Sequence, residues 1–153
     1  MDLKIDSKDL EIIECLKQDA SRSVRQIANK TKIPITTVHH RIKSLKEKGV
    51  IEKTTIKLDP EKMGLELSAY VLITAFSSFT SGEKVSQKKI CKELSKFSGI
   101  ELIDIVTGET DIIIKVRVKN IKELNKLILD KIREIPGVDK TNTFTVLEEI
   151  KID

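Results

Sequence analysis

The sequence contains few of the residues that build metal sites, redox centres or cofactor pockets. It has two cysteines and two histidines in 153 residues, no tryptophan, and only 3% aromatic residues. Cys15 and Cys91 are far apart and form no CxxC pair. The adjacent side chains His39 and His40 would point about 100° apart on a helix, which disfavours shared metal binding. We therefore expect free buried thiols, no metal site and no cofactor.

Long apolar runs are absent as well. A membrane-spanning helix needs about 18 or more apolar residues, whereas the longest apolar stretches here, 69–76 and 112–118, have the length of strands. The first residues do not resemble a signal peptide. No nucleophile–base pair, paired carboxylates or phosphate-binding loop marks an active site. The sequence predicts a globular, cytoplasmic protein without a membrane span that is not an enzyme and has no catalytic residues.

Positive charge is concentrated in the first half of the chain. Residues 20–57 contain 10 Lys and Arg against 2 Asp and Glu, whereas residues 61–153 contain 15 of each sign. A clustered basic patch is the electrostatic footprint of nucleic-acid binding. The alternative is a lysine-rich surface that only solvates the protein, and the clustering argues against it.

The stretch 32–49 predicts a helix at the centre of this basic region. Ile35, Val38, Ile42 and Leu45 recur every three or four residues and form one apolar stripe, and Gly49 ends the helix. Hydroxyls, imidazoles and amines on the opposite face are groups that read base edges in a major groove. The candidates for base contact are Thr36, Thr37, His40 and Lys43, with His39 at the margin.

Two shorter helices are expected before this one. Asp6 caps the first, and Ser23 and Gln26 form a capping box at the start of the second. Three short helices, the last two joined by a tight turn, predict a helix-turn-helix. The buried face of the first helix is expected to consist of Leu10, Ile13 and Leu16, with Ile12 or Cys15 alongside. The candidates for phosphate contact at the start of the second helix are Arg22, Ser23 and Arg25.

The second half changes to a strand-helix-strand-strand-helix-strand order, the ferredoxin-like βαββαβ pattern. The expected strands are 67–76, 100–106, 111–118 and 141–150, and the expected helices are 84–97 and 120–135. The first strand is apolar on both faces, so we expect the sheet face without helices to be buried against another subunit. The chain is thus predicted to be an α+β protein. Its expected domains are a winged helix-turn-helix over 1–49, a connecting strand and linker over 50–64, and a ferredoxin-like domain over 65–153.

These pieces, in order and at these spacings, resemble the Lrp/AsnC transcription regulators over roughly residues 5–151. The matching motifs are Asp6…Asp9, Ile27-Ala28, Thr37-Val38-His39-His40-Arg41-Ile42, Gly49-Val50-Ile51, Leu58-Asp59-Pro60, Thr107-Gly108…Asp111, Ile135-Pro136-Gly137-Val138 and Thr141-Asn142-Thr143. The resemblance implies an N-terminal domain that binds double-stranded DNA. A dimer would present two such domains, so we expect a roughly palindromic operator. The resemblance also implies homodimers that pair through their sheets and assemble into tetramers or octamers.

The resemblance further implies a small-molecule effector, usually an amino acid, bound between dimers. The implied effector-binding residues are Gly108, Glu109, Thr110, Asp111, Gly137, Thr141 and Thr143. Thr110 stands where the family often has an aromatic side chain, which favours a polar or charged amino acid over leucine. One alternative role for Asp111 is to close the hairpin turn, and one for the threonines is strand formation. An architectural DNA-binding protein without a ligand response is the alternative function.

Overall fold

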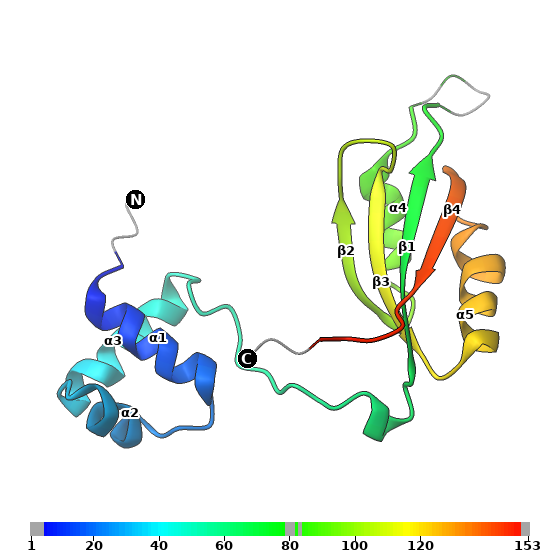
Figure 1. Ribbon diagram of the computed structural model, residues 1–153. Helices are drawn as coiled ribbons and strands as arrows, with labels where there is room; N and C mark the ends of the chain where they lie inside the picture. The colour runs from blue at the N-terminus through cyan, green and yellow to red at the C-terminus, as the bar shows by residue number, and fades with distance from the viewer. Residues whose placement is uncertain (1–4, 79–81, 83, 151–153) are drawn as a thin grey trace. The chain divides into compact units, whose positions relative to one another are not determined.

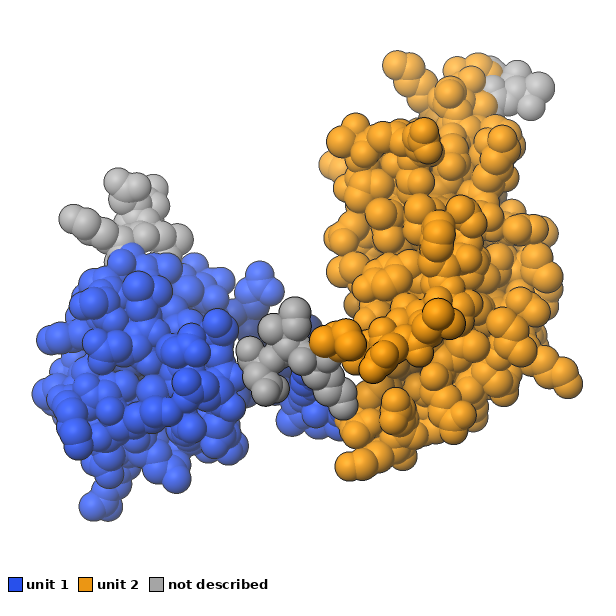
Figure 2. All heavy atoms as spheres, in the orientation of Figure 1, with its two compact units in different colours: residues 1–58 blue, residues 59–153 orange. Residues whose placement is uncertain are grey.

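The computed structural model describes residues 5–78, 82 and 84–150, which fold into two compact units (Figures 1 and 2). The first unit is Met1–Leu58 and the second is Asp59–Asp153. Each unit has its own cluster of buried apolar side chains. Each therefore has the core that an independent domain requires.

The first unit consists of three helices, α1 (Ser7–Gln18), α2 (Val24–Thr31) and α3 (Ile35–Glu47). The two predicted caps are confirmed. At α1 the Asp6 carboxylate accepts the backbone N–H of Asp9, and the Asp9 carboxylate accepts that of Asp6. At α2 Ser23 and Gln26 form the same reciprocal arrangement. These local contacts satisfy backbone donors that a helix start leaves unpaired.

The buried face of α1 differs from the predicted one. Ile12 and Cys15 are buried together with Ile27 and Val38, whereas Leu10 is 58% exposed. Ile12 and Cys15 are three residues apart and therefore share one side of the helix. Leu10 precedes Ile12 by two residues, which turns its side chain to the opposite side. The assignment of Leu10 to the core was wrong because apolar residues occupy more than one side of this helix.

The predicted connecting strand is not present in the described chain. Residues 52–58 form no regular element, and Ile56 and Leu58 are 77% and 55% exposed. An alternating sequence becomes a strand only when another strand supplies its hydrogen bonds, and none of the three described ladders includes this segment. A short 3-10 helix, Glu61–Met63, follows and ends at Gly64.

The second unit is a four-stranded antiparallel sheet with helices on one face (Figure 1). Its elements follow the predicted βαββαβ order, and the strands lie in the order β2-β3-β1-β4. The strands are β1 (Leu67–Ala75), β2 (Ile100–Ile105), β3 (Ile112–Val118) and β4 (Val138–Thr145), and the helices are α4 (Gln87–Leu94) and α5 (Ile121–Leu127), which continues as a π-helical turn over Ile128–Ile132.

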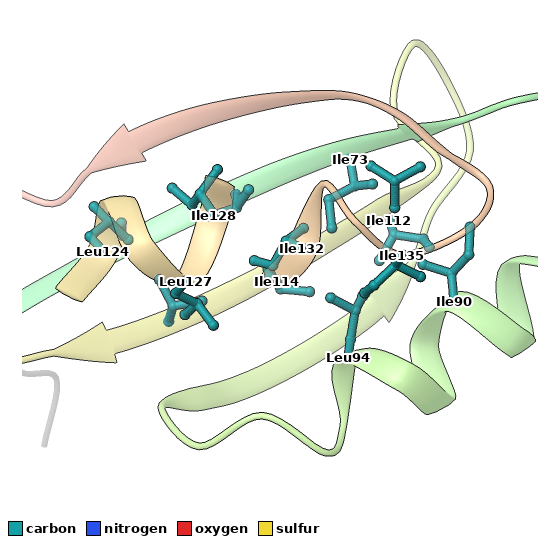
Figure 3. Packing of buried hydrophobic residues seen from close by; sticks show 14 of the residues in the cluster. Ile73, Ile90, Leu94, Ile112, Ile114, Leu124, Leu127, Ile128, Ile132 and Ile135 are labelled. Carbon is teal, nitrogen blue, oxygen red and sulfur yellow. The ribbon is translucent and has the colours of Figure 1, made fainter. Parts of the chain in front are cut away.

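The core of this unit lies between the sheet and its helices (Figure 3). Ala69, Val71 and Ile73 of β1 alternate inward and are fully buried, as the period of two predicts. Isoleucine and leucine side chains from α4 and from the α5 segment cover them. The fourth strand begins at Val138, earlier than the predicted Thr141, because Val138 pairs with Ala75 after a register shift that skips Asp139 of β4.

The other face of the sheet carries no helix and displays aromatic side chains. Tyr70 and Phe144 are direct cross-strand partners and are 38% and 53% exposed. Leu102 on β2 is 42% exposed. We call this surface, formed by Ser68, Tyr70, Leu72, Leu102, Lys115, Arg117 and Phe144, the open face.

A cluster of four charged side chains lies at one end of the open face. Arg117, only 8% exposed, donates from Nε to Glu101 at 2.6 Å and from Nη2 to Glu149 at 2.7 and 2.8 Å. Lys115 pairs with Glu149 at 2.7 Å. Burial lowers the pKa of Arg117, but its hydrogen bonds to Glu149 and Glu101 outweigh burial and raise it overall. The hydrogen bonds from Lys115 and Arg117 lower the pKa of Glu149 to about 2.

Candidate DNA-binding surface and effector site

The exposed side of α3 presents the predicted base-reading residues. Thr36, His39, His40 and Lys43 are exposed, and Thr37 is half-buried. Thr36, Thr37 and His40 line one open pocket of about 600 Å³. The two imidazole rings lie edge to face, 5.8 Å apart. All five predicted residues therefore lie on α3, and none of them is buried.

Lys43 and His39 lie outside the lining of this pocket. The Lys43 ammonium is 3.7 Å from the Glu47 carboxylate, one turn further along α3. Both side chains of this ion pair are exposed, so replacing Glu47 with another anion as the partner of Lys43 costs little free energy. Lys43 therefore remains available to a polyanion.

Sequence reasoning did not predict the contacts of Arg41. Its Nη1 atom donates to both carboxylate oxygens of Asp6 at 2.7 Å and to Asp9 at 2.9 Å. The three side chains join α3 to the start of α1 and line the same pocket as Thr36 and Thr37. Asp6, Asp9 and Arg41 belong to the motifs that resemble the Lrp/AsnC regulators, but 32 to 35 positions separate Arg41 from the two acids, so the motifs do not reveal the contact.

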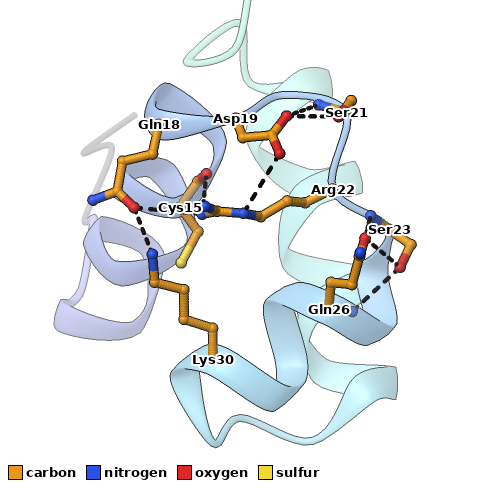
Figure 4. Close-up of polar contacts among 8 residues, drawn as sticks. All are labelled: Cys15, Gln18, Asp19, Ser21, Arg22, Ser23, Gln26 and Lys30. Atoms are coloured by element: carbon orange, nitrogen blue, oxygen red, sulfur yellow. Dashed lines mark hydrogen bonds and ion pairs between the residues drawn. The ribbon is translucent and has the colours of Figure 1, made fainter.

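The residues predicted to contact phosphates differ in their surroundings (Figure 4). Arg22 folds back onto α1, where it donates to the Cys15 carbonyl at 3.1 Å and lies 3.8 Å from the Asp19 carboxylate. The Ser23 hydroxyl accepts the N–H of Gln26 at 3.3 Å. Both side chains thus have partners within the unit. Arg25 is exposed and lines a second open pocket, of about 470 Å³, between α2 and α3.

Asp111 is held by groups of its own chain. One carboxylate oxygen accepts the backbone N–H of Ala75 at 2.8 Å, and the other accepts the Gln87 side-chain amide at 2.8 Å. Its own N–H donates to the Ile73 carbonyl. Asp111 therefore ties the 106–111 turn to the end of β1 and to the first residue of α4. This geometry matches the turn-closing alternative and leaves Gly108 and Glu109 exposed and Thr110 half-buried.

Gly137 and Thr141 also have structural partners. The Gly137 carbonyl accepts the N–H of Phe76 at 2.9 Å. A Cβ at Gly137 would lie 2.5 Å from Cγ1 of Val85, so any other residue there would force Val85 or the backbone to shift. The Thr141 hydroxyl accepts Nε of Arg133 at 2.8 Å, a contact that the sequence did not suggest. Thr143 is half-buried.

The sheet places the two predicted effector segments on either side of one strand. Asp111 donates to Ile73 of β1 from the β3 side, and Thr141 pairs with the same residue from the β4 side. Their separation is therefore about two strand spacings, roughly 10 Å. Within the described residues, no group of three or more His, Cys, Asp or Glu side chains is placed to hold a metal ion. None of the described helices is long and apolar enough to cross a membrane.

Comparison with known families assigns both units. The Lrp/AsnC ligand-binding domain model matches residues 69–153, and a winged helix-turn-helix DNA-binding model matches residues 5–52. These two domains define a transcriptional regulator with a DNA-binding and a ligand-binding part. The chain belongs to the Lrp/AsnC family.

Relatives along the whole chain agree with this assignment. An uncharacterised HTH-type transcriptional regulator of Pyrococcus furiosus is 39% identical over 150 residues, which cover 95% of this chain and 97% of the relative. The HTH-type transcriptional regulator FL11 of Pyrococcus horikoshii is 35% identical, with 99% and 95% covered.

Solved structures share the fold. The Neisseria meningitidis regulator NMB0573, in complex with L-methionine, superposes with a TM-score of 0.88 at 19% identity, and 97% of this chain and 94% of that chain are covered. The feast or famine regulatory protein Rv3291c of M. tuberculosis, also complexed with L-methionine, gives a TM-score of 0.86 at 24% identity, with 98% and 97% covered.

Proposed function

We propose that the protein is a sequence-specific transcriptional regulator that reads double-stranded DNA with α3 and responds to an amino acid or a related metabolite. The observation that carries this proposal is the polar surface of α3. Thr36, His40 and Lys43 are exposed side by side on a helix-turn-helix. Residues 20–57 around it hold 10 basic against 2 acidic residues. Such a surface combines base readout with attraction to phosphates.

The proposed DNA contacts are of two kinds, to base edges and to phosphates. We assign base edges to Thr36, Thr37, His40 and Lys43, with His39 at the margin of the groove. We assign phosphates to Arg25, which is exposed, and to the start of α2. Arg22 and Ser23 support that start from within the unit, since their side chains contact Cys15 and Gln26.

Substitutions on α3 and α2 test this division. A duplex is first selected by the wild-type protein from a random-sequence pool. We expect His40→Ala and Lys43→Ala to lose about 1–3 kcal/mol of binding to it and to relax the preference at one position each. Arg25→Ala should instead weaken selected and unrelated duplexes alike and reduce the salt dependence of binding. Wild-type binding of His40→Ala and Lys43→Ala to both duplexes would refute the assignment.

The effector proposal places an amino acid beside the turn that Asp111 holds. Gly108, Glu109 and Thr110 would line the site, Asp111 would fix the turn, and Gly137, Thr141 and Thr143 would contribute from a neighbouring dimer. Two findings support the amino-acid class, namely the ligand-binding family model over 69–153 and the methionine complexes of two proteins of the same fold. Thr110 makes this site polar, which favours a polar or charged amino acid.

A thermal-shift screen of the twenty amino acids tests the effector proposal. A ligand that binds only the folded protein raises its Tm by mass action. Calorimetry on wild type and Asp111→Ala then tests the site, and we expect the variant to bind weakly or not at all. If no amino acid binds at millimolar concentration, the architectural alternative, a DNA-binding protein without ligand response, replaces the proposal.

A homodimer paired through the open face is the assembly that we propose, with further association into tetramers or octamers. Tyr70 and Phe144 on this face are aromatic and partly exposed in the single chain. A dimer presents two α3 helices, so its operator should be roughly palindromic, with half-sites about one helical turn or a multiple apart.

A further inference from the structure

The side chain of Arg41 connects α3 to the N-terminal capping box of α1. Asp6 and Asp9 accept each other's backbone N–H at 3.0 and 3.2 Å, which forms the capping box of α1. Nη1 of Arg41 contacts both carboxylates, at 2.7 and 2.9 Å. One guanidinium of α3 therefore bonds to the two side chains that define where α1 begins.

The three side chains are partly shielded from water. Those of Arg41 and Asp9 are 28% and 14% exposed, and that of Asp6 is 50% exposed. The N–H of Asp9 and the Arg41 guanidinium hold the pKa of Asp6 below its usual range. Asp6 is therefore ionised at neutral pH, and with Asp9 and Arg41 it forms a cluster of two acids and one base.

This cluster lies on the surface that is expected to face DNA. Asp6, Asp9 and Arg41 line the same open pocket as Thr36, Thr37 and His40. Two carboxylates beside a phosphate backbone repel it, and the repulsion is stronger where the groups are shielded from water. Arg41 offsets much of that repulsion because it lies within 3 Å of both acids.

We propose that Arg41 is a positioning residue for DNA recognition, which neutralises Asp6 and Asp9 beside the base-reading surface and holds the start of α1 against α3. This inference rests on the proposed DNA-binding function. It assigns Arg41 a role through its two partners and not through a contact with DNA, because the guanidinium is directed at α1. Removing the Arg41 charge exposes the DNA to two unneutralised carboxylates.

A set of charge variants in the full chain tests this role on the selected duplex and on an unrelated duplex of the same length. Arg41→Gln keeps most of the side chain and removes the charge, and we expect it to raise the Kd for the selected duplex about tenfold. Arg41→Lys keeps the charge and should bind close to wild type. The triple variant Asp6→Asn, Asp9→Asn and Arg41→Gln removes the carboxylates as well, and we expect it to recover binding. Asparagine caps a helix about as well as aspartate, so the start of α1 is preserved.

Lys17→Gln is the matched control. Lys17 lies on α1 and pairs with Glu14 at 3.4 Å. It is not among the residues that line the pocket, so Lys17→Gln removes one positive charge, as Arg41→Gln does, but at a position outside the pocket. It should change binding far less than Arg41→Gln. Circular dichroism and thermal unfolding of each variant establish the temperature at which all are folded, and binding is compared there.

The outcomes separate the rival roles of Arg41. If the triple variant binds as weakly as Arg41→Gln, Arg41 contacts the DNA itself and the proposal is overturned. If Arg41→Gln lowers only the Tm and binds both duplexes as wild type does, the cluster serves stability alone and the proposal is equally overturned. If wild type does not discriminate between the two duplexes, the proposed function fails first, and with it this inference.

Discussion

At the scale of single residues, the hydrogen-bond partners of a charged side chain determine whether it holds the fold together or remains free to bind a ligand. In the sequence, Asp111, Arg22 and Arg41 have the character of surface groups, yet each bonds within its own unit. Asp111 holds a turn, Arg22 holds the end of α1, and Arg41 joins two helices. A formal charge therefore indicates a possible function only after its neighbours are known.

Glu149 gives a residue-scale prediction about stability and pH. Its pKa is lowered from 4.5 to about 2 by hydrogen bonds from Lys115 and then Arg117. The folded state thus binds its proton less readily than the unfolded state, so Glu149 stabilises the fold above pH 4.5 and loses this contribution as pH falls towards 2. The side chain is 37% exposed, so solvent screening reduces the contribution to about 1 kcal/mol.

Urea unfolding of wild type and Glu149→Gln at several pH values measures this contribution. We expect wild type to be more stable by about 1 kcal/mol at pH 7, with the difference shrinking steadily below pH 4.5. Glu148→Gln, at the exposed neighbouring position, is the control and should change little. A difference between wild type and Glu149→Gln that does not depend on pH would contradict the ion-pair explanation.

At the scale of elements, the connection from α5 to β4 is constrained at Gly137. Gly137 has φ +101, and a Cβ there would lie 2.5 Å from Cγ1 of Val85 and 3.3 Å from Cδ1 of Ile90. We expect Gly137→Ala to destabilise the protein by about 1–3 kcal/mol, since it adds both backbone strain and overpacking. Thermal or urea unfolding measures the loss.

Two further variants separate strain from overpacking at Gly137. Gly64 also has a positive φ, +73, but nothing lies within 4 Å of the position that a Cβ would occupy there, so Gly64→Ala should show the strain alone. Combining Gly137→Ala with Val85→Ala removes the blocking methyl group and should recover part of the loss. Equal destabilisation by Gly64→Ala and Gly137→Ala would show that crowding contributes nothing.

At the scale of the whole molecule, assembly is the property that a single chain leaves open. Tyr70 and Phe144 are cross-strand neighbours on the open face and remain 38% and 53% exposed. If this face pairs with a second copy, Phe144→Glu places a charge in an apolar interface and should convert dimers to monomers at micromolar concentration. Leu129→Glu, at a position 49% exposed on the helical side, should leave the dimer intact. Light scattering measures the oligomeric state of each variant, and a stable wild-type monomer would exclude the proposed dimer.

The sequence alone determined the features that depend on neighbouring residues. The caps at Asp6 and Ser23 use contacts three positions apart, so the residue types suffice to predict them. The period of two along β1 likewise puts Ala69, Val71 and Ile73 on one face of the strand, and all three are buried. Local patterns of this kind determined the order of the elements in the second unit and the position of α3.

Only the tertiary structure decided the features that depend on residues distant in the chain. It joined Arg41 to Asp6 across 35 positions, Asp111 to Ala75 across 36, and Arg117 to Glu149 across 32. It also left residues 52–58 without a strand, because a strand needs a partner and no described part of the chain supplies one. Hydrogen bonds and ion pairs act over about 3–4 Å in space, and sequence spacing does not reveal which distant groups come that close.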